Sequence, residues 1–286
     1  MNSDPAASSG NPGELVVLDD DDEVASVPRS PRKGIYILPN LFTVAALFGG
    51  FYAIVMAMNG RFELSAVGVF CAMVLDSLDG RVARMTNTQS TFGEQMDSLS
   101  DMVSFGAAPA LIVYEWALKG LGKLGWIAAF VYCAAAALRL ARFNTNIGVV
   151  DKRFFQGLPS PAAAAIVMGL VWLMDSLGVR DVESLEWLVW LAFVLTLFAG
   201  LTMVTNVPFY SFKDVSFKRS VPFVVIVAIA LGIAVINIHP PAVLFSLFVI
   251  YGLSGYCVYV WRKMKGRPVS VIATSTDEPD EHGWHP

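Results

Sequence analysis

Four aspartates, Asp76, Asp79, Asp97 and Asp101, lie close together in a chain that is apolar on both sides of them. On helices, spacings of three and four residues place the members of each pair on one face. In an antiparallel hairpin centred near position 88, the four carboxylates come level in two pairs. Because like charges repel and hard oxygen ligands suit Mg²⁺ or Mn²⁺, this spacing predicts a site for divalent cations.

The residues beside the aspartates indicate what the cations hold. Gly80 and Ala83 continue the helical face of the first two aspartates, and their small size leaves a hollow for a flat ring. Arg84, one turn beyond Gly80, can direct a bidentate guanidinium at a phosphate. Gly93, one turn before the third aspartate, removes a side chain from the facing helix. Together these residues predict a site for a metal-bound diphosphate.

The composition predicts that this site belongs to a membrane protein. Hydrophobic residues make up 55% of the chain, charged residues 15%, and the mean hydropathy is +0.58, whereas soluble domains carry about a quarter charged residues. The net charge of -4 comes largely from acidic tails and indicates no nucleic-acid partner. The three cysteines lack metal or disulfide spacing, and the three histidines lie at a helix edge or in the tail. The chemistry must therefore use carboxylates, arginines and hydroxyls.

Apolar runs recur along the chain, each long enough to cross a hydrocarbon core of about 30 Å. We expect spans near residues 37–58, 62–84, 93–117, 124–144, 158–177, 185–206, 220–238 and 241–261. This pattern predicts an all-α fold, a polytopic membrane bundle of about eight transmembrane helices. Residues 34–262 form the expected transmembrane catalytic domain, with a disordered cytoplasmic tail at 1–33, which has no signal-peptide pattern, and a second tail at 263–286.

The basic residues give the orientation, because cytoplasmic loops collect Lys and Arg. With the N-terminus inside, 16 of the 20 Lys and Arg residues lie on the inner side and 4 on the outer side. We therefore expect both termini and the turn of the aspartate hairpin to face the cytoplasm, in a multi-pass protein of the cell (inner) membrane.

The aspartate segment resembles the signature of the CDP-alcohol phosphatidyltransferase family at every position. The matching pattern is Asp76, two residues, Asp79, Gly80, two residues, Ala83, Arg84, eight residues, Gly93, three residues, Asp97, three residues and Asp101. Three further stretches, "LPNLFTVAALFGGFYAI", "LRLARFN" and "FFQGLPSPAAAA", resemble the bacterial-type branch that uses L-serine. The resemblance implies transfer of the phosphatidyl group from CDP-diacylglycerol to the L-serine hydroxyl, giving phosphatidylserine and CMP.

The family resemblance also implies individual roles. A first Mg²⁺ or Mn²⁺ would be bound by Asp76, Asp79 and Asp97, and a second by Asp76, Asp97 and Asp101. Asp101 would also be the general base for the acceptor hydroxyl. The CDP-diacylglycerol head group would be held by Gly80, Ala83, Arg84, Ser90, Gly93 and the "NLFT" segment that begins at Asn40. Family members are commonly homodimers, so a homodimer is expected here.

Several alternatives stay open at this point. Arg139 and Arg142 in "LRLARFN" either contact the serine carboxylate or a phosphate, or only follow the positive-inside pattern. "GLPSPAAAA" forms part of an acceptor pocket or is a plain helix start. The acceptor of the same chemistry could be glycerol 3-phosphate, inositol phosphate or choline. A divalent-cation transporter is a different function for the four carboxylates, although all of them lie near one membrane face.

Overall fold

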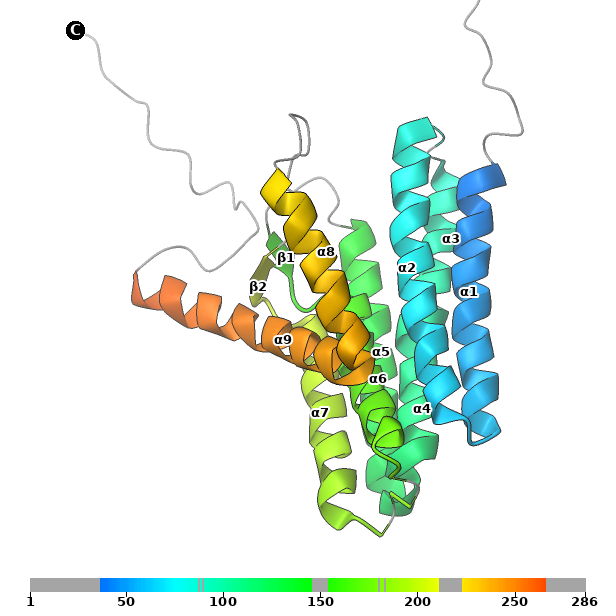
Figure 1. The fold of residues 1–286 in the computed structure, drawn as a ribbon, viewed down its shortest axis with the longest axis vertical. Helices are drawn as coiled ribbons and strands as arrows, with labels where there is room; N and C mark the ends of the chain where they lie inside the picture. Colours follow the sequence, from blue (N-terminus) through cyan, green and yellow to red (C-terminus); the bar gives the residue numbers. More distant parts are fainter. Residues whose placement is uncertain are drawn as a thin grey trace, which may run out of the picture. The chain divides into compact units, whose positions relative to one another are not determined.

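The structure is a computed structural model that describes residues 37–86, 88, 90–145, 154–179, 181, 182, 184–210 and 223–265. Most of these residues are helical (Figure 1). The main helices are α1 (Ile37–Met58), α2 (Phe62–Thr86), α3 (Thr91–Asp101), α5 (Lys123–Thr145), α6 (Ser160–Ser176), α7 (Glu186–Val204), α8 (Phe223–Ile238) and α9 (Pro240–Met264). The predicted tail at 1–33 lies outside the described residues, as does the predicted tail at 263–286 except for residues 263–265, of which 263 and 264 end α9.

The third predicted span is a continuous helical run that changes its winding. After α3, the chain passes through the π-helix η2 (Met102–Ala107), α4 (Ala108–Val113), the π-helix η3 (Tyr114–Leu118) and the 3-10 turn η4 (Lys119–Leu121). Short π-helical turns inside helices are frequent at functional sites, and η2 begins directly after Asp101. The hydroxyl of Tyr132 on α5 donates a 3.0 Å hydrogen bond to the Phe105 carbonyl within η2, which ties this turn to the core.

Four of the described helices are long and apolar enough to cross a membrane: Pro39–Met58, Lys123–Thr145, Glu186–Val204 and Pro240–Met264. The prediction of a helical membrane bundle is confirmed, but a count of eight spans is not. The other segments fall short for physical reasons. Helix α2 carries five charged side chains, and α6 and α8 have 17 and 16 residues.

Helices α1 and α2 form a tightly packed antiparallel hairpin (Figure 1). A Cβ added at Gly49 would lie 3.1 Å from the Gly68 carbonyl, and one at Gly68 would lie 3.1 Å from the Cβ of Ala53. Small residues at such positions allow two backbones to approach closely, as in membrane helix pairs. The N-terminal end of α1 and the turn between α2 and α3 lie at the same end of the bundle (Figure 1). This arrangement brings the "NLFT" segment beside the aspartate hairpin.

Two short strands, which the sequence analysis did not predict, lie between the helices. Strand β1 (Phe154–Gln156) pairs antiparallel with β2 (Pro208–Tyr210), with Phe155 opposite Phe209. They join the α5–α6 connection to the segment that follows α7. Gly157, just after β1, has φ +78°, and a Cβ there would lie 2.3 Å from the Met203 carbonyl, so the turn into α6 requires glycine.

Helix α6 confirms that "GLPSPAAAA" starts a helix. It begins at Ser160, has a proline in its first turn, and buries residues 162–165, all alanines. Proline suits this position because its missing N–H would have no intrahelical partner there. Helix α9 packs on α6 and β2 and runs across the direction of α5, α6 and α7 (Figure 1). Its Gly255 lies against the Phe209 ring.

Candidate active site

Three aspartates from α2 and α3 meet at the site that the sequence predicts. Asp76, Asp97 and Asp101, called the aspartate triad below, each offer a carboxylate oxygen within 4.8 Å of the others. Asp97 Oδ1 and Asp101 Oδ1 are buried and receive no hydrogen bond from any described residue. A buried anionic oxygen without a partner is costly. The triad therefore fits a divalent cation, which would supply the missing positive partner.

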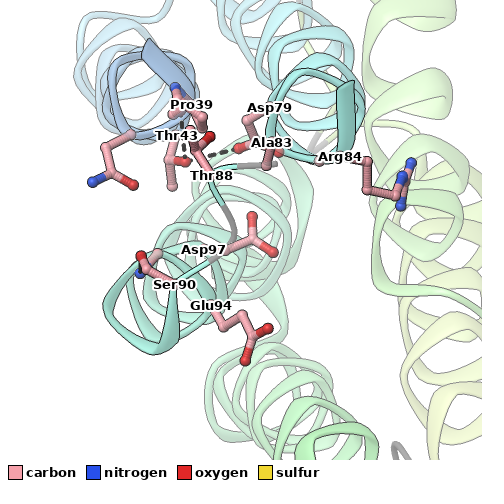
Figure 2. A pocket seen from close by; sticks show the side chains of 12 residues that line it. Pro39, Thr43, Asp79, Ala83, Arg84, Thr88, Ser90, Glu94 and Asp97 are labelled. Carbon is pink, nitrogen blue, oxygen red and sulfur yellow. Dashed lines mark hydrogen bonds between the residues drawn. The ribbon is translucent and has the colours of Figure 1, made fainter. Parts of the chain in front are cut away.

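Asp79 lies outside the triad. Its Oδ2 accepts a 2.9 Å hydrogen bond from the Thr43 hydroxyl on α1, drawn as a dashed line in Figure 2, and both side chains are buried. Of the four aspartates, three therefore have carboxylate oxygens close together. The fourth is turned toward α1.

Helix α1 also fixes the position of α3 and η2. The Ser100 hydroxyl donates to the Thr43 carbonyl and the Ser104 hydroxyl to the Ala46 carbonyl, both at 3.1 Å. Gly50 permits this approach, because a Cβ there would lie 2.5 Å from Ser104 Oγ. These contacts hold the helix that carries the last two aspartates at a fixed distance from α1.

A pocket with a volume of about 140 Å³ lies between the N-terminal end of α1, the C-terminal end of α2 and the start of α3. The residues lining it are Pro39, Asn40, Thr43, Asp79, Gly80, Ala83, Arg84, Thr88, Ser90, Gly93, Glu94 and Asp97 (Figure 2). They include all six residues that the sequence analysis assigned to the CDP-diacylglycerol head group.

Sequence reasoning missed three of the lining residues, Pro39, Thr88 and Glu94, and it included Thr43 without singling it out. Thr43 stands inside the quoted "NLFT" segment, which was the only signal for its position. The other three carry no spacing or residue type that separates them from ordinary helix ends. They were therefore found only through the fold.

Individual pocket residues have distinct local roles. A Cβ added at Gly80 would meet nothing within 4 Å, so the protein leaves open space there. Ser90 caps α3, because its hydroxyl accepts a 3.0 Å hydrogen bond from the Gly93 backbone N–H. The exposed Arg84 side chain extends away from Asp79 and Asp97 (Figure 2). The guanidinium of Arg84 therefore points away from the two carboxylates that line the pocket.

Arg139 and Arg142 do not line this pocket, and they have different hydrogen-bond partners. Arg139 Nη1 donates a 2.6 Å hydrogen bond to the hydroxyl of Ser160, at the start of α6. The positive charge of Arg139 also interacts electrostatically with Asp101. Arg139 therefore lies on the side of the triad that faces α6.

Arg142, one turn further along α5, binds other segments of the chain. Its guanidinium donates to four backbone carbonyls and one side-chain amide oxygen at 3.1 to 3.3 Å. The acceptors belong to Gln156, Met203, Val204, Thr205 and Asn206. Several of these carbonyls belong to the C-terminal end of α7, where a helix leaves its last carbonyls without partners. Arg142 thus joins α5, the end of α7 and the β1 strand.

Comparison with known proteins gives one consistent result. Residues 36–198 match the family of CDP-alcohol phosphatidyltransferases. A CDP-diacylglycerol--serine O-phosphatidyltransferase of Helicobacter pylori is 35% identical over 223 residues, which are 78% of this chain and 92% of the relative. The protein of that name from Mycobacterium leprae is 30% identical over 80% of this chain and 76% of its own. The protein of that name from Methanocaldococcus jannaschii is 33% identical over 66% of this chain and 82% of its own.

One solved structure is also similar, the Mycobacterium tuberculosis phosphatidylinositol phosphate synthase with CDP-DAG bound. It shares 22% identity and a TM-score of 0.43, over 59% of this chain and 85% of that chain. The family match spans more than half of the present sequence and includes the whole aspartate segment. The chain belongs to the CDP-alcohol phosphatidyltransferase family.

Proposed function

We propose that this membrane protein transfers the phosphatidyl group of CDP-diacylglycerol to the hydroxyl of L-serine, with release of CMP. One observation carries the proposal: the aspartate triad meets beside a pocket lined by the six residues expected to hold a nucleotide head group. The relatives at 30% to 35% identity named as serine phosphatidyltransferases support L-serine as the acceptor.

In this proposal the pocket holds the CDP part of the lipid. The open space beside Gly80 and Ala83 receives the flat cytosine or ribose ring, and Arg84 turns inward to the diphosphate. Asn40 and Ser90 lie beside Gly93, and all three also line the pocket. The acyl chains stay in the bilayer, because transferring them to water would expose large apolar surfaces.

Asp101 accepts the proton of the serine hydroxyl. The deprotonating hydroxyl oxygen attacks the phosphorus that bears the diacylglycerol, a new P–O bond forms, and the P–O bond to CMP breaks. Asp101 suits the role because Arg139 interacts electrostatically with it more strongly than with Asp76, and because Asp101 does not line the pocket. A positioned carboxylate base of this kind contributes about 100- to 10,000-fold to the rate.

The triad and Asp79 would hold two divalent ions, Mg²⁺ or Mn²⁺. When bound, these ions supply positive charge for the diphosphate and for the departing CMP. The fit rests on this chain's own carboxylates, of which two oxygens are buried without a hydrogen-bond donor among the described residues. Asp97 belongs to both the triad and the pocket lining, so it links the cation site to the head group.

Of the two arginines in "LRLARFN", Arg139 is the one we assign to the serine carboxylate. Ser160 is the one hydrogen-bond partner that Arg139 has within the described part of the chain, so further N–H donors remain for a ligand. Arg142 has five acceptors and instead keeps the surrounding backbone in place. Of these two arginines, only Arg139 has terminal N–H donors left for a ligand among the described residues, and one guanidinium suits a carboxylate of charge -1 better than a phosphorylated acceptor.

The proposed setting is the cell (inner) membrane, with eight spans, the catalytic site toward the cytoplasm, and a homodimer as the assembly. The excess of basic residues on the inner side supports the orientation. The four long apolar helices and the many exposed large apolar side chains, such as Phe48, Trp126 and Leu201, support residence in a bilayer.

The function is tested by acceptor-dependent release of CMP. Purified protein in detergent, with CDP-diacylglycerol and Mg²⁺ or Mn²⁺, is expected to release CMP and form phosphatidylserine only when L-serine is added. Parallel reactions contain glycerol 3-phosphate, inositol phosphate or choline, and the Asp97→Asn protein serves as the inactive control. Release of CMP with glycerol 3-phosphate and none with L-serine would contradict the assignment of the acceptor.

A further inference from the structure

Thr43 is joined to both helices that carry the aspartates. Its hydroxyl lies 2.9 Å from Asp79 Oδ2 on α2, and its carbonyl accepts the hydrogen bond from Ser100 on α3. The hydroxyl also lies 3.2 Å from the Pro39 carbonyl, but it has one proton, and the charged carboxylate at the shorter distance is the stronger acceptor. Thr43 is 4% exposed and Asp79 5%, so little of either side chain is open to competing water.

The four aspartates divide into two overlapping groups. The aspartate triad has converging oxygens, and Asp79 is not part of it. Asp79 and Asp97 line the head-group pocket, whereas Asp76 and Asp101 do not. Figure 2 shows the Asp79 carboxylate directed toward Thr43 across the upper part of this pocket. The triad is thus assembled in the protein alone, and Asp79 is held where the diphosphate would arrive.

We propose that Thr43 is a positioning residue that keeps Asp79 at the pocket, and that this makes the four aspartates unequal. The triad binds a divalent cation in the absence of substrate. Asp79 contributes to binding only when CDP-diacylglycerol is present, because phosphate oxygens then complete its ligand set. This inference rests on the proposed function, since it takes the pocket to be the site of the nucleotide lipid.

The physical basis is the orientation of a single carboxylate. The Thr43 hydroxyl donates to Asp79 Oδ2, and the Gly80 backbone N–H also donates to this carboxylate, whose remaining lone pairs can bind a cation. Partners of this kind fix the direction of a ligating carboxylate, and their removal commonly costs about 10- to 100-fold in metal affinity or activity. The Ser100 hydroxyl donates to the Thr43 carbonyl and fixes the Thr43 backbone. The Thr43 hydroxyl therefore cannot move together with a displaced Asp79 carboxylate. Loss of the hydroxyl therefore affects Asp79 and leaves the triad intact.

Binding of Mn²⁺ to the full-length protein in detergent tests the proposal, with free Mn²⁺ measured by electron paramagnetic resonance. The titration is made without lipid nucleotide and again with CDP-diacylglycerol but no serine. Wild-type protein is expected to bind one ion per chain alone and a second with CDP-diacylglycerol. Asp79→Asn should keep the first ion and lose the second, whereas Asp97→Asn should lose both.

The threonine variants isolate the positioning role. Thr43→Val keeps the side-chain shape without the hydroxyl and is expected to weaken only the substrate-dependent ion, by about 10- to 100-fold. Thr43→Ser restores the donor and should restore the affinity. Thr196→Val, at a buried threonine of α7 whose hydroxyl donates within its own helix to the Ala192 carbonyl, serves as the matched control, with both ions retained. A merely structural role of Thr43 would weaken both ions together.

Two results would overturn the inference. One is an Asp79→Asn protein that loses the substrate-free ion as fully as Asp97→Asn does. The other is a Thr43→Val protein with unchanged binding of the second ion. Failure of the proposed function gives a different pattern: CDP-diacylglycerol then changes no Mn²⁺ binding in the wild-type protein, and L-serine elicits no CMP release.

Discussion

The guanidinium of Arg139 donates a 2.6 Å hydrogen bond to the hydroxyl of Ser160, which joins α5 to the first residue of α6. Ser160 is fully buried, and "GLPSP" directs the chain into this contact through the turn at Gly157. The pair lies on the same side of the site as Asp101, whose charge Arg139 attracts. An amino acid bound here can direct its carboxylate to Arg139 and its hydroxyl to Asp101.

Arg139→Gln should impair the use of serine and leave the binding of CDP-diacylglycerol unchanged. Loss of hydrogen bonds from a charged donor costs about 1.5 to 3 kcal/mol, so the KM for L-serine should rise roughly 10- to 100-fold. Steady-state CMP release, with each substrate varied in turn, measures the effect. Arg139→Lys keeps the charge without the planar fork and should be intermediate. An equal rise in both KM values would contradict the assignment.

Arg142→Gln should act on stability first. Five acceptors lose a charged donor, and those at the end of α7 have no other partner within the helix. We expect the free energy of unfolding to fall by about 2 kcal/mol or more, seen as a lower Tm in a thermal denaturation assay. At a temperature where the variant is folded, its KM for L-serine should stay near the wild-type value. A large rise in that KM without loss of stability would instead place Arg142 among the substrate contacts.

Gly80→Ala should impair the use of CDP-diacylglycerol without lowering the stability of the protein. Alanine in a helix is favoured over glycine by about 1 kcal/mol, and the new Cβ meets no protein atom within 4 Å, so the Tm should rise or stay constant. The methyl group enters the pocket, where crowding typically costs about 1 to 3 kcal/mol, so the KM for CDP-diacylglycerol should rise roughly tenfold or more. Gly60→Ala provides a control at a glycine outside the pocket, although its φ of +68° makes that change destabilising. Unchanged kinetics for Gly80→Ala would remove this glycine from the head-group site.

The helices could be predicted from the sequence because each one is an apolar run bounded by polar or proline-containing segments. The first expected span, 37–58, coincides with α1, and the expected start at 62 is the start of α2. The pairing of β1 with β2 could not be predicted, because each strand has three residues and they are far apart in the chain. The π-helical winding of η2 could not be predicted either, since it depends on contacts with α1 and α5.

In the site too, features set by local spacing could be predicted from the sequence, whereas contacts between distant residues could not. The spacing of the aspartates predicted their convergence, because two helical faces in a hairpin suffice for it. The bond between Thr43 and Asp79 joins residues 36 positions apart and has no local pattern. Arg139 and Arg142 were indistinguishable in sequence, as both are arginines on the same helix at the inner side. Only the positions of Ser160 and of the carbonyls at the end of α7 separate their roles.

Asp101→Asn should nearly abolish turnover while CDP-diacylglycerol still binds. The amide cannot accept the hydroxyl proton, and loss of a general base alone lowers kcat about 100- to 10,000-fold. Because Asp101 also belongs to the triad, the Mn²⁺ affinity of the variant is measured beside its kcat. At Mn²⁺ concentrations that saturate the variant, kcat should remain low, which separates the proton transfer from weaker cation binding. Glu186→Gln, at the exposed start of α7, is the matched control and should behave as wild type. Full recovery of kcat at high Mn²⁺ would make Asp101 a cation ligand and assign the base to another group.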